Sequence, residues 1–207
     1  MESFYKKWFF PHLMDLALGG EPFSGLRGEL LSRARGEVLE IGLGTGLNLA
    51  HYPKTVKQVH GVEPSEAMLG RAQKRIEASG LSVTSYLGGA EELPFEDQRF
   101  DQVVSSWTLC SIADLPAALR EIKRVLKPTG IFFFVEHGAH PNWRVRKWQD
   151  RLNPLHQHIS GGCNLNRDFA TLLRAQGFCF ENLSCFELPG EPKLFNYHYF
   201  GTARILE

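Results

Sequence analysis

The stretch VLEIGLGTGLNLAHYP, residues 38–53, places three glycines, Gly42, Gly44 and Gly46, directly after an apolar run. A short buried strand that ends in a glycine-rich turn is typical of the first strand–helix unit of an open parallel sheet. Glycines at this turn let a ligand approach the main-chain N–H groups. The stretch therefore predicts an α/β fold with a ligand site at the carboxyl end of its first strand.

An alternation of strands and helices extends outward from this stretch. The pattern predicts strands over 36–42, 56–64, 81–88, 99–107, 131–138, 179–188 and 195–206, and helices over 45–52, 65–80, 115–130, 143–152 and 167–178. One or two further helices precede the first strand. Strands that alternate with helices form parallel sheets covered on both faces. We expect a seven-stranded, mostly parallel, doubly wound sheet whose last strand is antiparallel.

One domain accounts for a chain of 207 residues. We divide it into a helical N-terminal lid (1–34), a cofactor-binding core (35–138) and an acceptor-side insert with the C-terminal strands (139–207). Lys+Arg and Asp+Glu are equal at 23 each, and this balance disfavours a nucleic-acid partner. The sequence leaves the oligomeric state open.

Cysteine usage and hydropathy indicate a cytoplasmic protein. The cysteines, Cys110, Cys163, Cys179 and Cys185, form no C-x-x-C pair and no His/Cys cluster with zinc spacing. We therefore expect free thiols and no metal. The longest purely apolar run, residues 131–135, is too short to span a bilayer. Lysines among aromatic residues near the N-terminus leave a weak peripheral contact with a membrane surface open.

Two acidic residues narrow the choice of ligand. Glu40 stands just before the glycines, where it would repel a pyrophosphate but suit a cation, and Glu63 ends the second strand, where an acid accepts hydrogen bonds from ribose hydroxyls. The glycine spacing is G-x-G-x-G, and Leu47 stands where a dinucleotide motif has its third glycine. The expected ligand therefore carries a ribose and a positive charge but no phosphate. S-adenosylmethionine carries both.

At this point the chain resembles the class I S-adenosylmethionine-dependent methyltransferases. The resemblance rests on VLEIGLGTG, GVEPSEAML, GGAEELPFEDQRFDQVVSSWTLCSI and EIKRVLKPTGIFFFVEHG, and it covers residues 36–138. GTGLNLAHYP, TLCSI, FVEHG and GGCNLNR add a narrower similarity to the thiol S-methyltransferase branch of the methyltransferase-like proteins and its bacterial phospholipid-methyltransferase-like relatives.

The resemblance implies a role for each matching residue. The methionine end of the cofactor would lie against Glu40, Gly42, Gly44 and Gly46, and the ribose against Glu63. The adenine would be flanked by Pro64 and Met68 and edged by Ala90 and Glu91, while Ser106 and Trp107 would border the sulfonium. Many relatives carry an aspartate for the adenine amino group where this chain has Gly89. That contact would pass to Glu91 or to the backbone.

These roles lead to a small-molecule methyltransferase that converts S-adenosylmethionine to S-adenosylhomocysteine. An apolar lid is expected from Phe4, Tyr5, Trp8, Phe9 and Phe10 together with Trp143, Trp148, Leu152 and Leu155. An apolar pocket favours reaction of a thiolate with a sulfonium, so a thiol is the first choice of acceptor. The alternatives are an amine, a lipid headgroup, a quinone precursor, or a non-catalytic cofactor-binding protein. His137, after the fifth strand, is the candidate proton acceptor.

Overall fold

The computed structural model describes residues 8–205, so the expectations for Phe4, Tyr5, Lys6 and Lys7 lie outside the described residues. The described part contains a seven-stranded sheet. Its strands are β1 (Gly36–Ile41), β2 (Val56–Glu63), β3 (Val83–Leu87), β4 (Phe100–Ser106), β5 (Leu126–His137), β6 (Phe178–Glu187) and β7 (Tyr197–Ile205).

The strands lie in the order β3-β2-β1-β4-β5-β7-β6. β1 to β5 pair in parallel, and β7 runs antiparallel to both of its neighbours, β5 and β6. The order reverses at β1, so the carboxyl ends of β1 and β4 flank a topological switch point, where ligands bind in such sheets. This arrangement confirms the predicted seven-stranded, mostly parallel sheet with an antiparallel last strand.

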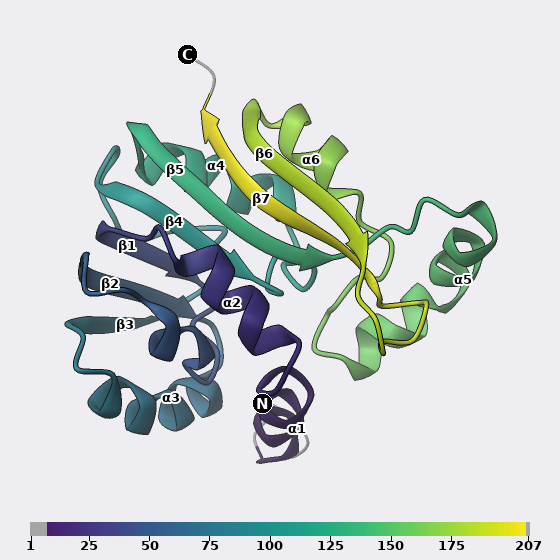
Figure 1. The fold of residues 1–207 in the computed structure, drawn as a ribbon, viewed down its shortest axis with the longest axis horizontal. Helices are drawn as coiled ribbons and strands as arrows, with labels where there is room; N and C mark the ends of the chain where they lie inside the picture. Colours follow the sequence, from purple (N-terminus) through teal and green to yellow (C-terminus); the bar gives the residue numbers. More distant parts are fainter. Residues whose placement is uncertain (1–7, 206–207) are drawn as a thin grey trace.

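Helices cover both faces of the sheet, as Figure 1 shows. The helices are α1 (Phe10–Leu18), α2 (Phe23–Leu31), α3 (Glu66–Ser79), α4 (Leu115–Val125), α5 (Trp143–Ile159) and α6 (Phe169–Ala175), with a 3-10 helix η2 (Leu47–His51) after the glycine-rich turn. Side chains of α4 and α6 join the core on one face, and those of α2, η2 and α3 join the core on the other.

β5 shows why the sheet needs both layers. Phe132 and Phe134 enter the core under α4 and α6, whereas Phe133 and Val135 enter the core under α2. Successive side chains on a strand point to opposite faces, and all four are buried. The continuous apolar run in β5 thus reflects a strand that is covered by helices on both faces, as is usual in parallel sheets.

Three local predictions differ from the structure. The segment after the glycines forms the short 3-10 helix η2 rather than an α-helix over 45–52. α4 ends at Val125, before Pro128, and β5 begins at once. α5 extends to Ile159, beyond the predicted end at 152, and holds Pro154 in its interior.

The two N-terminal helices and α5 take different places relative to the sheet, and α2 crosses one face of it (Figure 1). α1 lies beyond the carboxyl ends of the strands, and α5 projects away from the sheet (Figure 1). Among residues 8–205, no helix is both long enough and apolar enough to cross a bilayer.

Candidate functional site

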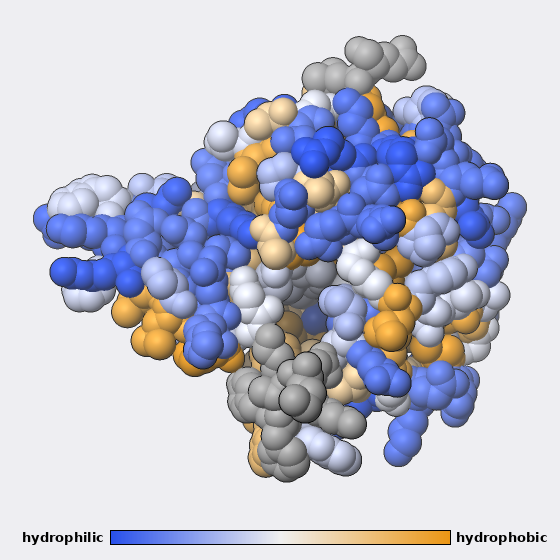
Figure 2. All heavy atoms as spheres, turned by 180° about the vertical axis from the view of Figure 1, so that it is seen from behind, coloured by the Kyte–Doolittle hydropathy of each residue, from blue (hydrophilic) through white to orange (hydrophobic). Residues whose placement is uncertain are grey.

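A cavity of about 490 Å³ opens at the carboxyl ends of β1, β2 and β4. Seen from the side opposite to Figure 1, the surface is hollowed between the projecting α5 and the body of the molecule (Figure 2). α1 contributes Phe10, Met14 and Leu18 to the wall. Ten of the predicted cofactor residues also line it: Glu40, Gly42, Gly44, Glu63, Pro64, Met68, Ala90, Glu91, Ser106 and Trp107.

The three glycines of the turn meet different neighbours. A Cβ atom on Gly42 would lie 2.3 Å from the side chain of Thr108, so the backbone packs too closely there for any side chain. A Cβ on Gly44 would meet nothing nearer than 3.9 Å, and the space that it would occupy belongs to the cavity. Gly46 is not among the lining residues. It takes a left-handed conformation, with φ of 82°, that starts η2.

Glu40 lies on β1 and is buried beneath the turn. Tyr52 Oη donates a hydrogen bond of 2.8 Å to its carboxylate, and Asn48 Nδ2 donates one of 3.1 Å. Burial raises the pKa of Glu40 to about 7, although these hydrogen bonds and the charge of Arg27 act in the opposite direction. A positively charged ligand group in the cavity would favour the carboxylate and lower this pKa.

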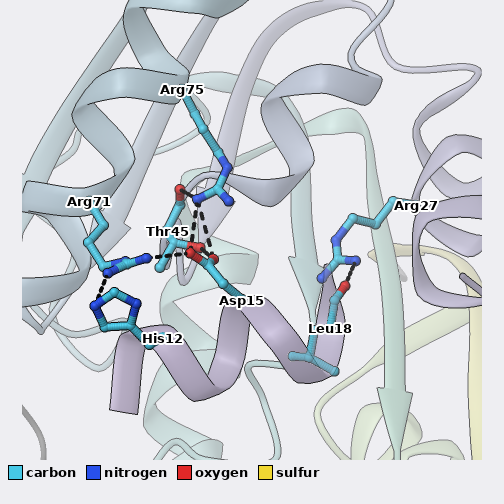
Figure 3. A network of polar contacts seen from close by, with 7 residues as sticks. All are labelled: His12, Asp15, Leu18, Arg27, Thr45, Arg71 and Arg75. Carbon is cyan, nitrogen blue, oxygen red and sulfur yellow. Dashed lines mark hydrogen bonds and ion pairs between the residues drawn. The ribbon is translucent and has the colours of Figure 1, made fainter. Parts of the chain in front are cut away.

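Arg27 of α2 also lines the cavity, and the sequence analysis missed it. The side chain is buried, and its guanidinium lies 4.8 Å from the centre of the Trp107 ring. Its Nη1 donates a hydrogen bond of 2.6 Å to the carbonyl of Leu18 (Figure 3). Burial lowers the pKa of Arg27 to about 10, so it remains a cation at neutral pH. No motif spacing marks an arginine inside the short stretch FSGLRGELL.

Glu63 connects the ends of β1 and β2. One carboxylate oxygen accepts a hydrogen bond of 3.0 Å from the N–H of Gly44, and the other accepts one of 3.0 Å from the N–H of Ser65. Each carboxylate oxygen can accept a second hydrogen bond. Glu63 can therefore hold the turn in place and still accept from ligand hydroxyls.

On the far side of the cavity, Glu91 occupies the space beside Gly89. A Cβ atom built on Gly89 would lie 2.5 Å from Oε2 of Glu91. The Glu91 carboxylate thus reaches the place where an aspartate at position 89 would begin its side chain. This geometry favours the first of the two expectations, in which Glu91 takes over the missing adenine contact.

The turn after β4 forms the wall opposite the glycines. Trp107 has φ of 51°, a left-handed conformation that is costly for a bulky residue and is typical of functional sites. The buried carboxylate of Glu136 accepts hydrogen bonds from the N–H groups of Thr108 and Leu109, at 2.9 and 2.8 Å. Glu136 therefore fixes this strained turn from below, a role that no spacing in the sequence indicated.

α1 is fastened across the glycine-rich turn by Asp15. The Asp15 carboxylate accepts a hydrogen bond from the Thr45 hydroxyl and pairs with Arg71 at 3.0 Å and Arg75 at 3.3 Å, both from α3 (Figure 3). Arg75 also donates to the carbonyl of Thr45 at 2.9 Å. This Asp15 cluster joins the lid helix, the turn and α3 beside the cavity.

His137, the candidate proton acceptor, is not among the cavity-lining residues. Its Nε2 lies 3.0 Å from Sγ of Cys163, which lies 3.5 Å from Sγ of Cys110. The expected acceptor-side residues of α5 also differ from their prediction. Trp143, Trp148 and Leu155 are exposed, and none of them lines the cavity.

The cavity suits the charges and the polar groups of S-adenosylmethionine. Its methionine end is a zwitterion, and Glu40 and Arg27 offer one charge of each sign. Among the described residues, Asn48 Oδ1, Trp107 Nε1 and Arg27 Nε are buried without a hydrogen-bond partner, and all three residues line the cavity. Buried polar atoms are rarely left unpaired, so a polar ligand is the expected partner of these three.

The sequence of this chain is similar to those of known methyltransferases. Residues 39–134 match the family described as "Methyltransferase domain". The rat (Rattus norvegicus) protein thiol S-methyltransferase TMT1B is 33% identical over 178 residues, which cover 78% of this chain and 72% of that protein. Phosphatidylethanolamine N-methyltransferase of Cereibacter sphaeroides is 33% identical over 139 residues, or 65% of this chain and 66% of that one.

A solved structure gives the same fold at lower identity. Geranyl diphosphate methyltransferase, in complex with S-adenosylmethionine, superimposes with a TM-score of 0.69 and 15% identity, covering 88% of this chain and 84% of that chain.

Proposed function

This chain belongs to the S-adenosylmethionine-dependent methyltransferases, and from that premise we propose that its methyl acceptor is a thiol on a small apolar or amphipathic molecule. The observation that carries the proposal is the similarity to a thiol S-methyltransferase over 78% of the chain. The apolar side chains that α1 adds to the cavity wall support it.

The cofactor supplies a methyl group on a sulfonium, which is an activated leaving group. We assign the residues of the chain to binding and orientation. Glu40 pairs with the ammonium of the methionine end and Arg27 with its carboxylate, while Glu63 accepts from the ribose hydroxyls. Holding both reactants in line supplies much of the rate of such a displacement, up to roughly 7–11 kcal/mol in favourable cases.

An apolar acceptor side suits a thiolate better than an amine. A thiolate and a sulfonium lose their charges together as the methyl group moves, so a water-poor wall favours the transition state over the separated ions. Phe10, Met14 and Leu18 provide such a wall. An amine leaves a positive charge on the product, and the same wall helps that reaction less. A thiol also reacts without a strong protein base, because a few per cent is ionised at neutral pH.

The rival acceptor is a lipid headgroup amine, and the relative from Cereibacter sphaeroides is the reason to keep it in view. The test therefore varies the nucleophile alone. Three acceptors with one apolar carbon skeleton, bearing a thiol, an amine or a hydroxyl, are incubated with the enzyme and cofactor. Vesicles that contain phosphatidylethanolamine form a fourth arm. Formation of S-adenosylhomocysteine is measured in each.

We expect turnover of the thiol and little turnover of its amine and hydroxyl analogues. A reaction without enzyme gives the background. Glu63→Ala is the enzyme control, since it should weaken cofactor binding by roughly 1–3 kcal/mol and lower turnover at limiting cofactor. Turnover of the amine or of the vesicles, with none of any thiol, would refute the thiol assignment while leaving the family intact.

A further inference from the structure

Three donors that soft metal ions prefer converge beside the cavity, on segments far apart in the sequence. Cys110 lies in the turn after β4, His137 at the end of β5, and Cys163 in the segment after α5. The two Sγ atoms and one ring nitrogen of His137 all lie within 4.8 Å of one another. We call these three residues the Cys–His–Cys cluster.

The spacing of the cluster is close to that of a metal site. His137 Nε2 lies 3.0 Å from Cys163 Sγ, and the two sulfurs are 3.5 Å apart. In a tetrahedral site with Zn–S of about 2.3 Å and Zn–N of about 2.0 Å, neighbouring ligand atoms lie roughly 3.5–3.8 Å apart. The two distances in this cluster are therefore within about 0.5 Å of those in such a site, and the third, from Cys110 Sγ to the ring of His137, is at most 4.8 Å. Small side-chain adjustments would admit an ion.

The backbone around the cluster is held firmly. The N–H of Cys110 donates to the Glu136 carboxylate at 3.3 Å, and its carbonyl accepts from the N–H and the Nδ2 of Asn164, at 2.9 and 2.8 Å. His137 lies on β5, paired with His198 of β7. The donors thus need little ordering when an ion binds, which lowers the free-energy cost of forming the site.

The donor set selects the kind of ion. Two cysteine sulfurs and one imidazole match zinc, whereas calcium and magnesium require oxygen ligands. Two thiolates would balance the charge of a divalent ion, which suits the burial of Cys110. His137 Nε2 faces Cys163 Sγ at 3.0 Å, so the imidazole would bind the metal through Nε2 with the ring proton on Nδ1.

We propose that Cys110, His137 and Cys163 bind a zinc ion, with water at a fourth position. The ion would join the turn after β4, the end of β5 and the segment after α5. The first and the last of these contribute residues such as Ser111 and Gly161 to the cavity wall. This proposal departs from the expectation of no metal. It does not depend on which acceptor is methylated.

Cobalt replaces zinc as the spectroscopic probe. The full chain is stripped of metal with a chelator, kept reduced by a phosphine that does not compete as a thiol ligand, and titrated with Co²⁺. We expect saturation at one Co²⁺ per chain, with an intense thiolate-to-metal band in the near ultraviolet and visible bands of tetrahedral Co²⁺. Added Zn²⁺ should remove these bands, and Zn²⁺ should raise the melting temperature.

Matched cysteine variants locate the site. Cys110→Ser and Cys163→Ser should lose the thiolate band, whereas Cys179→Ser and Cys185→Ser, which change exposed cysteines of β6, should keep it. Circular dichroism and binding of S-adenosylhomocysteine show that each variant is folded. The absence of a thiolate band in the folded, reduced wild-type chain would overturn the proposal. So would a band that survives in Cys163→Ser, or a protein whose Cys110 and Cys163 form a disulfide and bind no Co²⁺ once reduced.

Discussion

Glu40 and Arg27 bring opposite charges to the same end of the cavity, and burial disfavours the ionised form of each. Burial raises the pKa of Glu40 to about 7 and lowers the pKa of Arg27 to about 10. A zwitterionic ligand end would compensate both residues at once. The ionisation of Glu40 should therefore be coupled to cofactor binding near neutral pH.

The first prediction concerns the pH dependence of binding. Between about pH 5.5 and about pH 8, wild-type affinity for S-adenosylhomocysteine should rise with pH, because the ligand ammonium prefers the Glu40 carboxylate to its protonated form. Glu40→Gln should bind more weakly at the higher pH and lose most of this dependence. Calorimetry at the two pH values measures both effects. An equally steep dependence in the variant would assign it to another group.

Ionisation of the buried Glu40 should also lower the unfolding free energy of the unliganded protein as the pH rises. Its folded-state pKa of about 7 lies above its ordinary value of 4.5, so its stabilising contribution is present below 4.5 and is lost as the pH rises through 7. The loss is on the order of 3 kcal/mol at most. In urea denaturation without ligand, the unfolding free energy of Glu40→Gln should fall less than that of the wild type from about pH 5 to about pH 8. Parallel curves for the two proteins would contradict the raised pKa.

Moving the carboxylate from position 91 to position 89 tests whether Glu91 contacts the adenine. Glu91→Ala should weaken S-adenosylhomocysteine binding by roughly 1–3 kcal/mol, since a charged hydrogen-bond acceptor is lost. Gly89→Asp alone should bind no better than the wild type, because its new Cβ meets the Glu91 carboxylate. The double variant should recover affinity over Glu91→Ala. Unchanged binding in the folded single variant Glu91→Ala would remove Glu91 from the site.

At the scale of elements, the Asp15 carboxylate supplies the ion pairs that hold α1 over the cavity. Arg71 also contacts His12 of α1. Arg27 donates to the carbonyl of Leu18.

Asp15→Ala should loosen α1 against the turn and α3, and with it the apolar wall of Phe10 and Met14. Steady-state kinetics should show the KM for the acceptor raised several fold, with a smaller change in S-adenosylhomocysteine affinity. Asp97→Ala, which breaks an exposed ion pair with Arg124, is the matched control. Equal kinetic constants in Asp15→Ala and the wild type would mean that α1 is not a lid.

The same elements show what the sequence could predict. The positions of Glu40 and Glu63 follow from parallel strands that end at one edge of the sheet, and both line the cavity. Arg27 could not be placed, because α2 reaches the cavity only through tertiary packing. The Cys–His–Cys cluster joins residues such as Cys110 and Cys163, which are 53 positions apart. Local spacing holds no information on such a contact.

Local signals also misled the prediction of where helices begin and end. Pro154 favours a break, because proline removes one helical hydrogen bond, yet α5 continues past it to Ile159. The motif predicted that Gly46 contacts the ligand, whereas in the structure Gly46 takes the left-handed conformation that begins η2. In both cases the local sequence pattern did not indicate the conformation that the structure shows. The division into lid, core and acceptor side stays a prediction.

At the scale of the whole molecule, the cofactor residues and the apolar wall meet at one edge of one sheet. The glycine-rich turn, the end of β2 and the turn after β4 supply the polar side, and α1 and α2 close it. Most of the candidate cofactor residues therefore lie at the ends of β1, β2 and β4, whereas the proposed acceptor side takes its apolar residues from α1. We infer that alignment and exclusion of water, rather than a protein base, drive methyl transfer.

The most direct test is a pH–rate profile, at low acceptor concentration, for a series of apolar thiols with graded pKa values. If the thiol reacts as its own thiolate, the inflection should move with the pKa of each acceptor, to lower pH for more acidic thiols. An inflection that stays at one pH for every thiol would mean that a protein group such as His137 removes the proton. That result would contradict a site that only aligns and desolvates its acceptor.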